Sequence, residues 1–271
     1  MNIERFYAKL DRYYSGTKSY QAENFLVDSL RTAIDQKDYP SVLIVCNELG
    51  GFYRAMGRYP DAVPIYLEAI NALRKLGMFR TENHATTLIN QATNYAVWGK
   101  SIDALELFEA ARFIFENLGI TVDFRIAALH NNMSIVCQDM EDFNGAIEHL
   151  NEALKILCQL EDTEIEVATT YTNLAQIKLH AKDYDGALIE IEKSLALFDS
   201  AKALTDTHYS VALETHGDIC DKLGMYADAL VSYQKAAMLV REQFGEDHRG
   251  YQSLVFNVGK CQRKLMRGEN K

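Results

Sequence analysis

Asparagine side chains recur along this sequence at intervals of 41 or 42 residues. Asn90, Asn132 and Asn173 occupy equivalent positions, with Glu48 one interval before them and Thr215 one interval after them. An amide donates and accepts hydrogen bonds at the same time, so it can pair with a peptide backbone without requiring a particular side chain. Three such amides along one surface would contact successive parts of one ligand. The same chemistry would also let these asparagines tie one helix to its neighbour, so the pattern leaves both roles open.

The sequence carries no arrangement of residues that is typical of an enzyme. The GxSxG, GxxxxGK[ST], GxGxxG and HExxH motifs are all absent. The 7 histidines and 5 cysteines are scattered, without a CxxC pair or another metal-ligand spacing. We therefore expect a non-enzymatic protein that uses neither a metal nor a cofactor.

A repeat of small residues indicates helical hairpins. Five alanines mark the repeat at intervals of 41 or 42 residues: Ala62, Ala104, Ala146, Ala187 and Ala229. Further small residues lie seven positions after and twelve positions before each alanine, and a largely aromatic position lies three before it. Small residues let two antiparallel helices approach closely. Because one hairpin cannot bury its own apolar face, neighbouring hairpins are expected to stack.

This spacing predicts an all-α fold, a right-handed superhelical α-solenoid of antiparallel helix hairpins with about thirteen helices. Five repeats are expected at about 41–82, 83–124, 125–166, 167–207 and 208–247. Residues 1–40 are interpreted as N-terminal helices divided by Ser15-Gly16-Thr17, a candidate degenerate repeat. Residues 248–271 are expected to form a C-terminal capping helix and a tail.

The repeat resembles the tetratricopeptide repeat. Six residues of the first repeat match its pattern: Gly50, Tyr53, Gly57, Tyr59, Ala62 and Ala69. The long period and the segments ATTLINQATNY and ATTYTNLAQIK are similar to the kinesin light chain type. The resemblance implies an interaction scaffold, and it implies that the recurring asparagines face a concave groove and hydrogen-bond an extended peptide.

The resemblance places ten candidate peptide-binding residues in this groove: Asn90, Asn132, Asn173, Asn47, Arg54, Thr93, Asn131, Gln176, Asp218 and Asp221. A structural interpretation of the asparagines stays open, in which they tie one helix to its neighbour. The carboxy-terminal end of the groove is acidic, with Glu214 beside Asp218 and Asp221. That charge predicts a ligand with a neutral or basic segment at this end.

The chain as a whole is acidic, with a formal net charge of −10. Such a surface repels phosphate backbones and anionic lipids, so we expect neither nucleic acid nor membrane as a partner. One basic cluster lies in the last helix and tail and is interpreted as complementing the helix dipole: Lys260, Arg263, Lys264, Arg267 and Lys271. The lack of a signal-peptide pattern and the scattered cysteines predict a cytoplasmic protein.

Together these features predict a non-enzymatic scaffold that binds a peptide segment of a partner protein in a concave groove, as a monomer or weak homodimer. Two alternatives stay open. One is a bacterial signalling-peptide sensor of the tetratricopeptide type that acts through a partner protein. The other is a self-assembling structural oligomer. Ligand-dependent compaction would favour the sensor, and a concentration-dependent mass would favour self-assembly.

Overall fold

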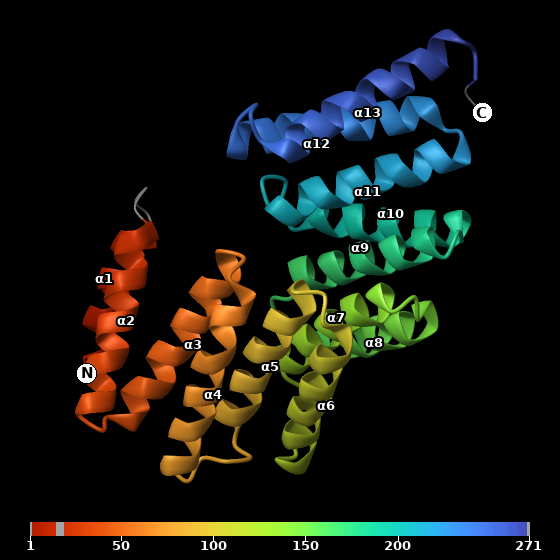
Figure 1. Ribbon diagram of the computed structural model, residues 1–271. Coiled ribbons are helices and arrows are strands. Elements are labelled where there is room, and N and C mark those ends of the chain that lie inside the picture. The colour runs from red at the N-terminus through yellow and green to blue at the C-terminus, as the bar shows by residue number, and fades with distance from the viewer. Residues whose placement is uncertain (1, 15–18, 270–271) are drawn as a thin grey trace. The chain divides into compact units, whose positions relative to one another are not determined.

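The computed structural model describes residues 2–14 and 19–269, and within them it contains thirteen α-helices and no strand (Figure 1). The helices are α1 (Ile3–Tyr14), α2 (Ser19–Asp35), α3 (Tyr39–Ala55), α4 (Tyr59–Lys75), α5 (Glu82–Val97), α6 (Ser101–Asn117), α7 (Phe124–Asp139), α8 (Phe143–Leu157), α9 (Glu164–His180), α10 (Tyr184–Ser200), α11 (Thr207–Leu223), α12 (Tyr226–Phe244) and α13 (Arg249–Met266). The predicted all-α class and helix number are confirmed. The predicted break at Ser15-Gly16-Thr17 lies outside the described residues.

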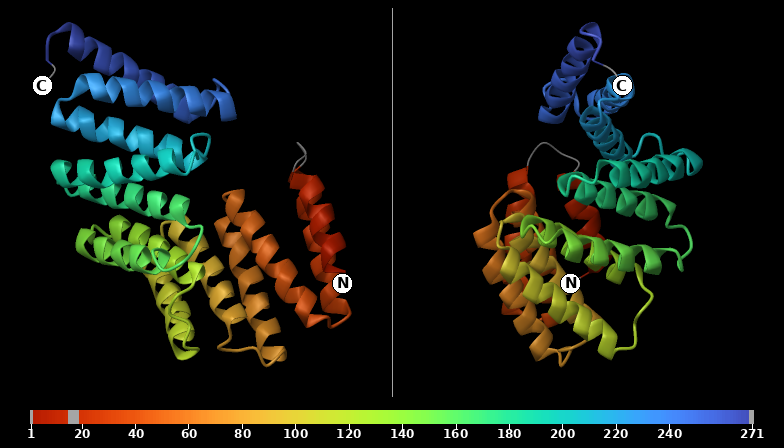
Figure 2. Two further views of the ribbon diagram at one scale, coloured as in Figure 1. Left: turned by 180° about the vertical axis from the view of Figure 1, so that it is seen from behind. Right: turned by 90° about the vertical axis from the view of Figure 1, so that its right-hand side faces the viewer.

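The chain divides into two compact units. Residues 1–121 form the first unit, with α1–α6, and residues 122–271 form the second, with α7–α13. Within each unit, consecutive helices form antiparallel hairpins that lie side by side (Figure 2). Each unit is thus a stack of helix hairpins, the α-solenoid arrangement that the repeat predicts. Within the described residues, no helix is both long and apolar enough to cross a membrane.

Each of the five central hairpins turns through a residue in the left-handed region. Three hairpins use Gly57, Gly99 and Gly224, with φ of 69°, 77° and 82°. The other two use Glu141 and Lys182, with φ of 61° and 65°. Glycine adopts this conformation without steric cost, and other residues do so less readily. The five turns therefore share one backbone conformation, although two of them lack the glycine.

The small residues of the repeat lie where the two helices of a hairpin touch. Ala62 and Ala69 of α4 are fully buried, and so is Tyr66 between them. A Cβ atom added to Gly50 of α3 would lie only 2.5 Å from Cζ of Tyr66. The tyrosine ring thus occupies the space that a side chain on α3 would need. The same contact joins Gly217 of α11 to Tyr233 of α12, at 2.6 Å.

The Gly50→Ala substitution is expected to destabilise the protein. Overpacking costs about 1–3 kcal/mol, which outweighs the roughly 1 kcal/mol that alanine gains over glycine in a helix. The adjacent Gly51→Ala is the matched control, because an added Cβ there has no neighbour within 4 Å. Urea unfolding should therefore give a lower midpoint for Gly50→Ala and a higher one for Gly51→Ala. Equal midpoints would contradict the proposed close contact.

Candidate functional site

The ten sequence-predicted residues all lie on the first helices of the hairpins, and all ten side chains are half-buried. We call the surface that carries them the A face and describe it separately in each unit. In the first unit it comprises Asn47 and Arg54 on α3, with Asn90 and Thr93 on α5. In the second unit it comprises Asn131 and Asn132 on α7, Asn173 and Gln176 on α9, and Asp218 and Asp221 on α11.

In the first unit, asparagine side chains connect α3 to α5. Asn47 donates through Nδ2 to the carbonyl oxygen of Leu43 at 3.1 Å and to Oγ1 of Thr87 at 3.3 Å. Its Oδ1 accepts a hydrogen bond from Nδ2 of Asn90 at 3.1 Å. Arg54 extends the connection, since its Nη1 donates to the carbonyl oxygen of Asn90 at 3.4 Å. The two first helices of this unit are therefore joined by a polar ladder.

The second unit repeats this ladder between α7 and α9. Asn131 donates through Nδ2 to the carbonyl oxygen of Ala127 at 3.3 Å and to Oγ1 of Thr170 at 3.1 Å. Its Oδ1 accepts from Nδ2 of Asn173 at 3.1 Å. The atoms and their partners are the same as in the first unit. Two independent occurrences indicate that the ladder is a property of the repeat.

A different pair of side chains joins α9 to α11. Gln176 donates through Nε2 to Oγ1 of Thr215 at 3.0 Å, and Thr215 donates to the carbonyl oxygen of Val211 at 2.9 Å. Thr93 of α5 likewise returns its hydroxyl to its own helix, at Ile89. Gln176, Thr215 and Thr93 therefore use donors or acceptors for hydrogen bonds within the protein.

The structural interpretation of the asparagines thus has direct support. Each tie pairs two different positions of the repeat, Asn47 with Asn90 and Asn131 with Asn173, whereas the sequence alignment placed Asn90, Asn132 and Asn173 in one column. These hydrogen bonds do not use every donor and acceptor of the amides. Asn90 and Asn173 each keep Oδ1 and one N–H without a partner among the described residues. Asn132 makes no side-chain hydrogen bond to any described residue.

Sequence reasoning missed the threonines of the ladders. Thr87 and Thr170 are fully buried and accept from the asparagine of the preceding first helix. Both also donate to their own helix, to Asn83 and Glu166. The signal was present in the repeated segments ATTLINQ and ATTYTNL, where a threonine precedes the asparagine by three residues.

A pocket of about 430 Å³ lies at the α11 end of the A face in the second unit. The helices α9, α11 and α13 carry most of its lining, which comprises Leu179, His180, Lys182, Tyr184, Asp218, Asp221, Lys222, Tyr233, Asn257 and Lys260. Two predicted site residues, Asp218 and Asp221, therefore meet in one pocket. The sequence had not placed α13 beside them.

Asp221 is neutralised within the protein. Lys260 and Lys264 of α13 approach its carboxylate at 2.7 and 2.6 Å. Burial alone would raise the pKa of Asp221, but the hydrogen bonds from these two lysines outweigh it and lower the pKa below its ordinary value. Lys264 also lies 4.2 Å from the ring centroid of Tyr226.

Two expectations from the sequence need correction here. The basic residues of α13 were interpreted as complements of a helix dipole, yet Lys260 and Lys264 form ion pairs with Asp221. Lys271 lies outside the described residues. The pocket is also not acidic, because Lys182, Lys222 and Lys260 line it beside the two aspartates. The charge argument for a basic ligand segment therefore no longer holds.

The remaining carboxylates of α11, Glu214 and Asp218, have pKa values above the ordinary range. Asp218 accepts a hydrogen bond from the hydroxyl of Tyr233 at 2.6 Å. Burial raises the pKa of Asp218 above its ordinary value, although this hydrogen bond opposes the shift. Burial also raises the pKa of Glu214, and the charge of Asp218 adds to the effect.

The corresponding place in the first unit is built differently. Gly51 occupies the position that Asp218 has in the second unit, and Tyr66 occupies that of Tyr233. With no carboxylate at position 51, the buried hydroxyl of Tyr66 has no hydrogen-bond partner among the described residues. Burial raises the pKa of Tyr66 to about 12.

A histidine and a cysteine also meet in the second unit, but not as a nucleophile and its base. His216 Nδ1 lies 2.8 Å from Oγ of Ser232, and Sγ of Cys220 lies 3.7 Å from the same imidazole. Burial lowers the pKa of His216 and raises the pKa of Cys220 to about 12. A thiol with so high a pKa stays protonated and inert at neutral pH. The described residues contain no cluster of three or more ligands able to hold a metal ion.

Comparison with known proteins identifies the repeat. The sequence pattern of the tetratricopeptide repeat matches residues 41–117, 125–200 and 166–237, which is more than half of the chain. The chain belongs to the tetratricopeptide repeat family. This confirms the resemblance on which the A face was first predicted.

Two curated relatives are kinesin light chain-related proteins 3 and 2 of Arabidopsis thaliana. The first is 23% identical over 241 residues, which is 87% of this chain and 36% of the relative. The second is 23% identical over 194 residues, which is 68% of this chain and 28% of the relative. The chain thus spans about a third of the length of these relatives. Their similarity supports the kinesin light chain type of repeat.

Two solved structures have the same fold. BtubC (BKLC) from P. vanneervenii gives a TM-score of 0.71 at 20% identity, covering 85% of this chain and 94% of BtubC. The apo form of RapI gives a TM-score of 0.67 at 16% identity, covering 97% of this chain and 70% of RapI. At such identities the likeness concerns the fold alone.

The two tyrosines provide a matched test of the A-face chemistry. Tyr233→Phe removes a hydrogen bond to a carboxylate and is expected to lower the free energy of unfolding by about 1–3 kcal/mol. Tyr66→Phe removes a hydroxyl that has no partner, so stability should stay the same or increase. Chemical denaturation of both variants measures the difference. A comparable loss in Tyr66→Phe would show that its hydroxyl is satisfied.

The ion pairs of Asp221 predict a pH-dependent stability. Because the folded-state pKa is lowered, their contribution is present above the ordinary pKa of aspartate and is lost as the pH falls through the lowered value. The double variant Lys260→Met/Lys264→Met should therefore unfold at lower urea than wild type at pH 7, and this deficit should shrink below about pH 4. Lys222→Met, in the same pocket but without an ion pair, is the control. A deficit that does not change with pH would contradict the assignment.

Proposed function

We propose that this protein is a non-enzymatic interaction scaffold and that its A face binds a peptide segment of a partner protein. Membership of the tetratricopeptide repeat family supports protein–protein interaction in general. The observation that carries the finer proposal is the uncommitted hydrogen-bonding capacity of Asn90, Asn132 and Asn173 on half-buried surface.

The ladders give these amides a second use. An asparagine fixed by one hydrogen bond has lost most of its rotamer freedom before a ligand arrives. Ordering it on binding then costs less than ordering a free side chain, for which about 0.5–1.5 kcal/mol is typical. Asn90 and Asn173 therefore present a preorganised carbonyl and N–H to a peptide backbone.

The pocket beside α11 supplies a place for a ligand side chain in the second unit. It combines the half-buried Asp218 and the buried Tyr233 with three lysines and His180. Such a mixed lining favours a polar group that both donates and accepts hydrogen bonds, rather than a strongly charged one.

Asn132 offers the most direct test, because its side chain makes no hydrogen bond to a described residue that a substitution would remove. A peptide selected against the whole protein by phage display is the probe, and its Kd is measured by fluorescence anisotropy. Asn132→Ala should weaken binding about fivefold, corresponding to roughly 1 kcal/mol for one hydrogen bond, with no change in thermal stability. Asn173→Ala, in the same unit, should lower both affinity and stability.

Asn151→Ala is the matched control, because Asn151 is an exposed asparagine on α8. It should leave the Kd unchanged. If Asn132→Ala and Asn173→Ala both bind as wild type, the peptide does not use the A face of the second unit. The sensor alternative can be followed in the same titration by small-angle scattering, since it requires the protein to compact when the peptide binds.

A further inference from the structure

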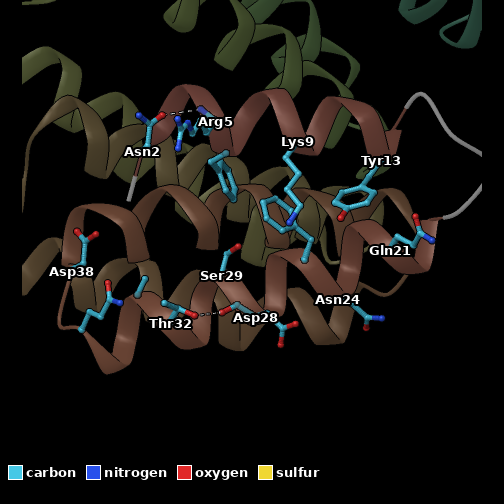
Figure 3. A pocket seen from close by; sticks show the side chains of 14 residues that line it. Asn2, Arg5, Lys9, Tyr13, Gln21, Asn24, Asp28, Ser29, Thr32 and Asp38 are labelled. Atoms are coloured by element: carbon cyan, nitrogen blue, oxygen red, sulfur yellow. Dashed lines mark hydrogen bonds between the residues drawn. The ribbon is translucent and has the colours of Figure 1, made fainter.

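A larger hollow lies in the first unit, away from the amide ladder. It has a volume of about 700 Å³ and lies between α1 and α2 (Figure 3). Its lining includes Arg5, Phe6, Lys9 and Tyr13 of α1 and Phe25 of α2. In Figure 3 the side chains of Lys9 and Tyr13 point from α1 toward α2. We call this hollow the α1–α2 cleft.

The equivalent surface of the next hairpin, α3–α4, shows how such a surface is covered. Residues 40 positions later, Cys46, Leu49 and Tyr53 of α3 and Ile65 of α4, correspond to the cleft residues Phe6, Lys9, Tyr13 and Phe25. The later set belongs to one core cluster with Leu26 and Leu30, which come from α2. The equivalent surface of the α3–α4 hairpin is therefore covered by a helix. Among the described residues of the first unit, no further helix covers the α1–α2 cleft.

The floor of the cleft is aromatic. The ring centroids of Phe6 and Phe25 are 5.4 Å apart, and those of Tyr13 and Phe25 are 5.5 Å apart. Nζ of Lys9 lies 4.5 Å from the centroid of Phe25. This row of rings matches the apolar stripe of an amphipathic helix better than it matches a polar extended peptide.

The two walls differ in charge. On the α1 wall, Arg5 and Lys9 have no carboxylate partner among the described residues. Across the cleft, Asp28 lies 3.8 Å from Arg31, and Asp38 caps α3 by accepting a hydrogen bond from the backbone N–H of Ser41. The other lining residues of α2 are uncharged. Lys9 also occupies the position at which the next hairpin has the buried Leu49, so a cation lies in the middle of the α1–α2 cleft. Lys9 is exposed, so its ammonium group is available to a carboxylate of an occupant.

The length of the cleft sets the size of the occupant. The 12 residues of α1 rise about 18 Å at 1.5 Å per residue. A docked helix of about three turns would match this wall. Its apolar residues would recur at i, i+3 or i+4, and i+7, with carboxylates on the flank that faces α1.

We propose that the α1–α2 cleft is a second docking site, which binds an acidic amphipathic helix of a partner protein independently of the A face. The aromatic floor supplies the contact area, and Arg5 and Lys9 select the acidic flank. This site adds to the proposed peptide binding and does not depend on it.

The test uses a display library of hydrocarbon-stapled 14-residue helices selected against the whole chain. Enriched helices are expected to carry Glu or Asp beside the apolar stripe. Anisotropy titrations should show about tenfold weaker binding, or roughly 1.4 kcal/mol, for Lys9→Glu. Replacing the facing peptide carboxylate by lysine should restore most of that loss. Lys75→Glu, at an exposed position of α4 outside the cleft, should bind as wild type.

Two further variants keep the outcomes distinct. Phe25→Leu retains an apolar floor but removes the ring, so it should also weaken the helix while keeping the fold, as circular dichroism can verify. Asn132→Ala should leave helix binding unchanged even where it weakens an A-face peptide. The proposal is overturned if no helix is enriched, if enriched helices are not acidic, or if Lys9→Glu binds normally. It is also overturned if sedimentation shows that a second copy of the chain fills the cleft.

Discussion

The close contact between a small residue on one helix and a large ring on the next is the constraint on which both units depend. At Gly50 the ring of Tyr66 occupies the place of a side chain, and at Gly217 the ring of Tyr233 does so. Dense packing at these points draws the two helices of a hairpin together and buries the alanines that flank the ring. The apolar face that remains is covered only when hairpins stack.

Stacking brings the first helices of successive hairpins side by side, and this creates a second requirement. Polar side chains that become half-buried between two helices need hydrogen-bond partners. The asparagine and threonine ladders of α3–α5 and α7–α9 meet this need with the same atoms in both units. A surface held in this way is also one whose remaining donors and acceptors have fixed directions. Structural and binding roles of these asparagines are therefore compatible.

The first and last helices, α1 and α13, each pack against a neighbouring helix, but their surroundings differ. At α13, two lysines neutralise Asp221, so a helix that ends the second unit also completes a pocket. At α1, Leu10 stands where the next hairpin has Gly50, so α1 cannot approach α2 in the same way at that point. The aromatic residues beyond it line a cleft. The two lysines of α13 are thus paired within the protein, whereas the first hairpin leaves a cleft long enough for a docked helix.

The sequence by itself determined the helices, their number and their pairing, because small residues at a fixed period permit only one kind of close helix contact. Only the tertiary structure decided which side chains meet across hairpins. Asn47 with Asn90 and Asp221 with Lys260 are pairs about 40 residues apart, and their contact depends on the rotation of one helix against another. The division after residue 121 was likewise not visible in the repeat, whose period continues unchanged through that point. Periodicity fixes local geometry, whereas the partner of a polar group follows from how whole helices pack.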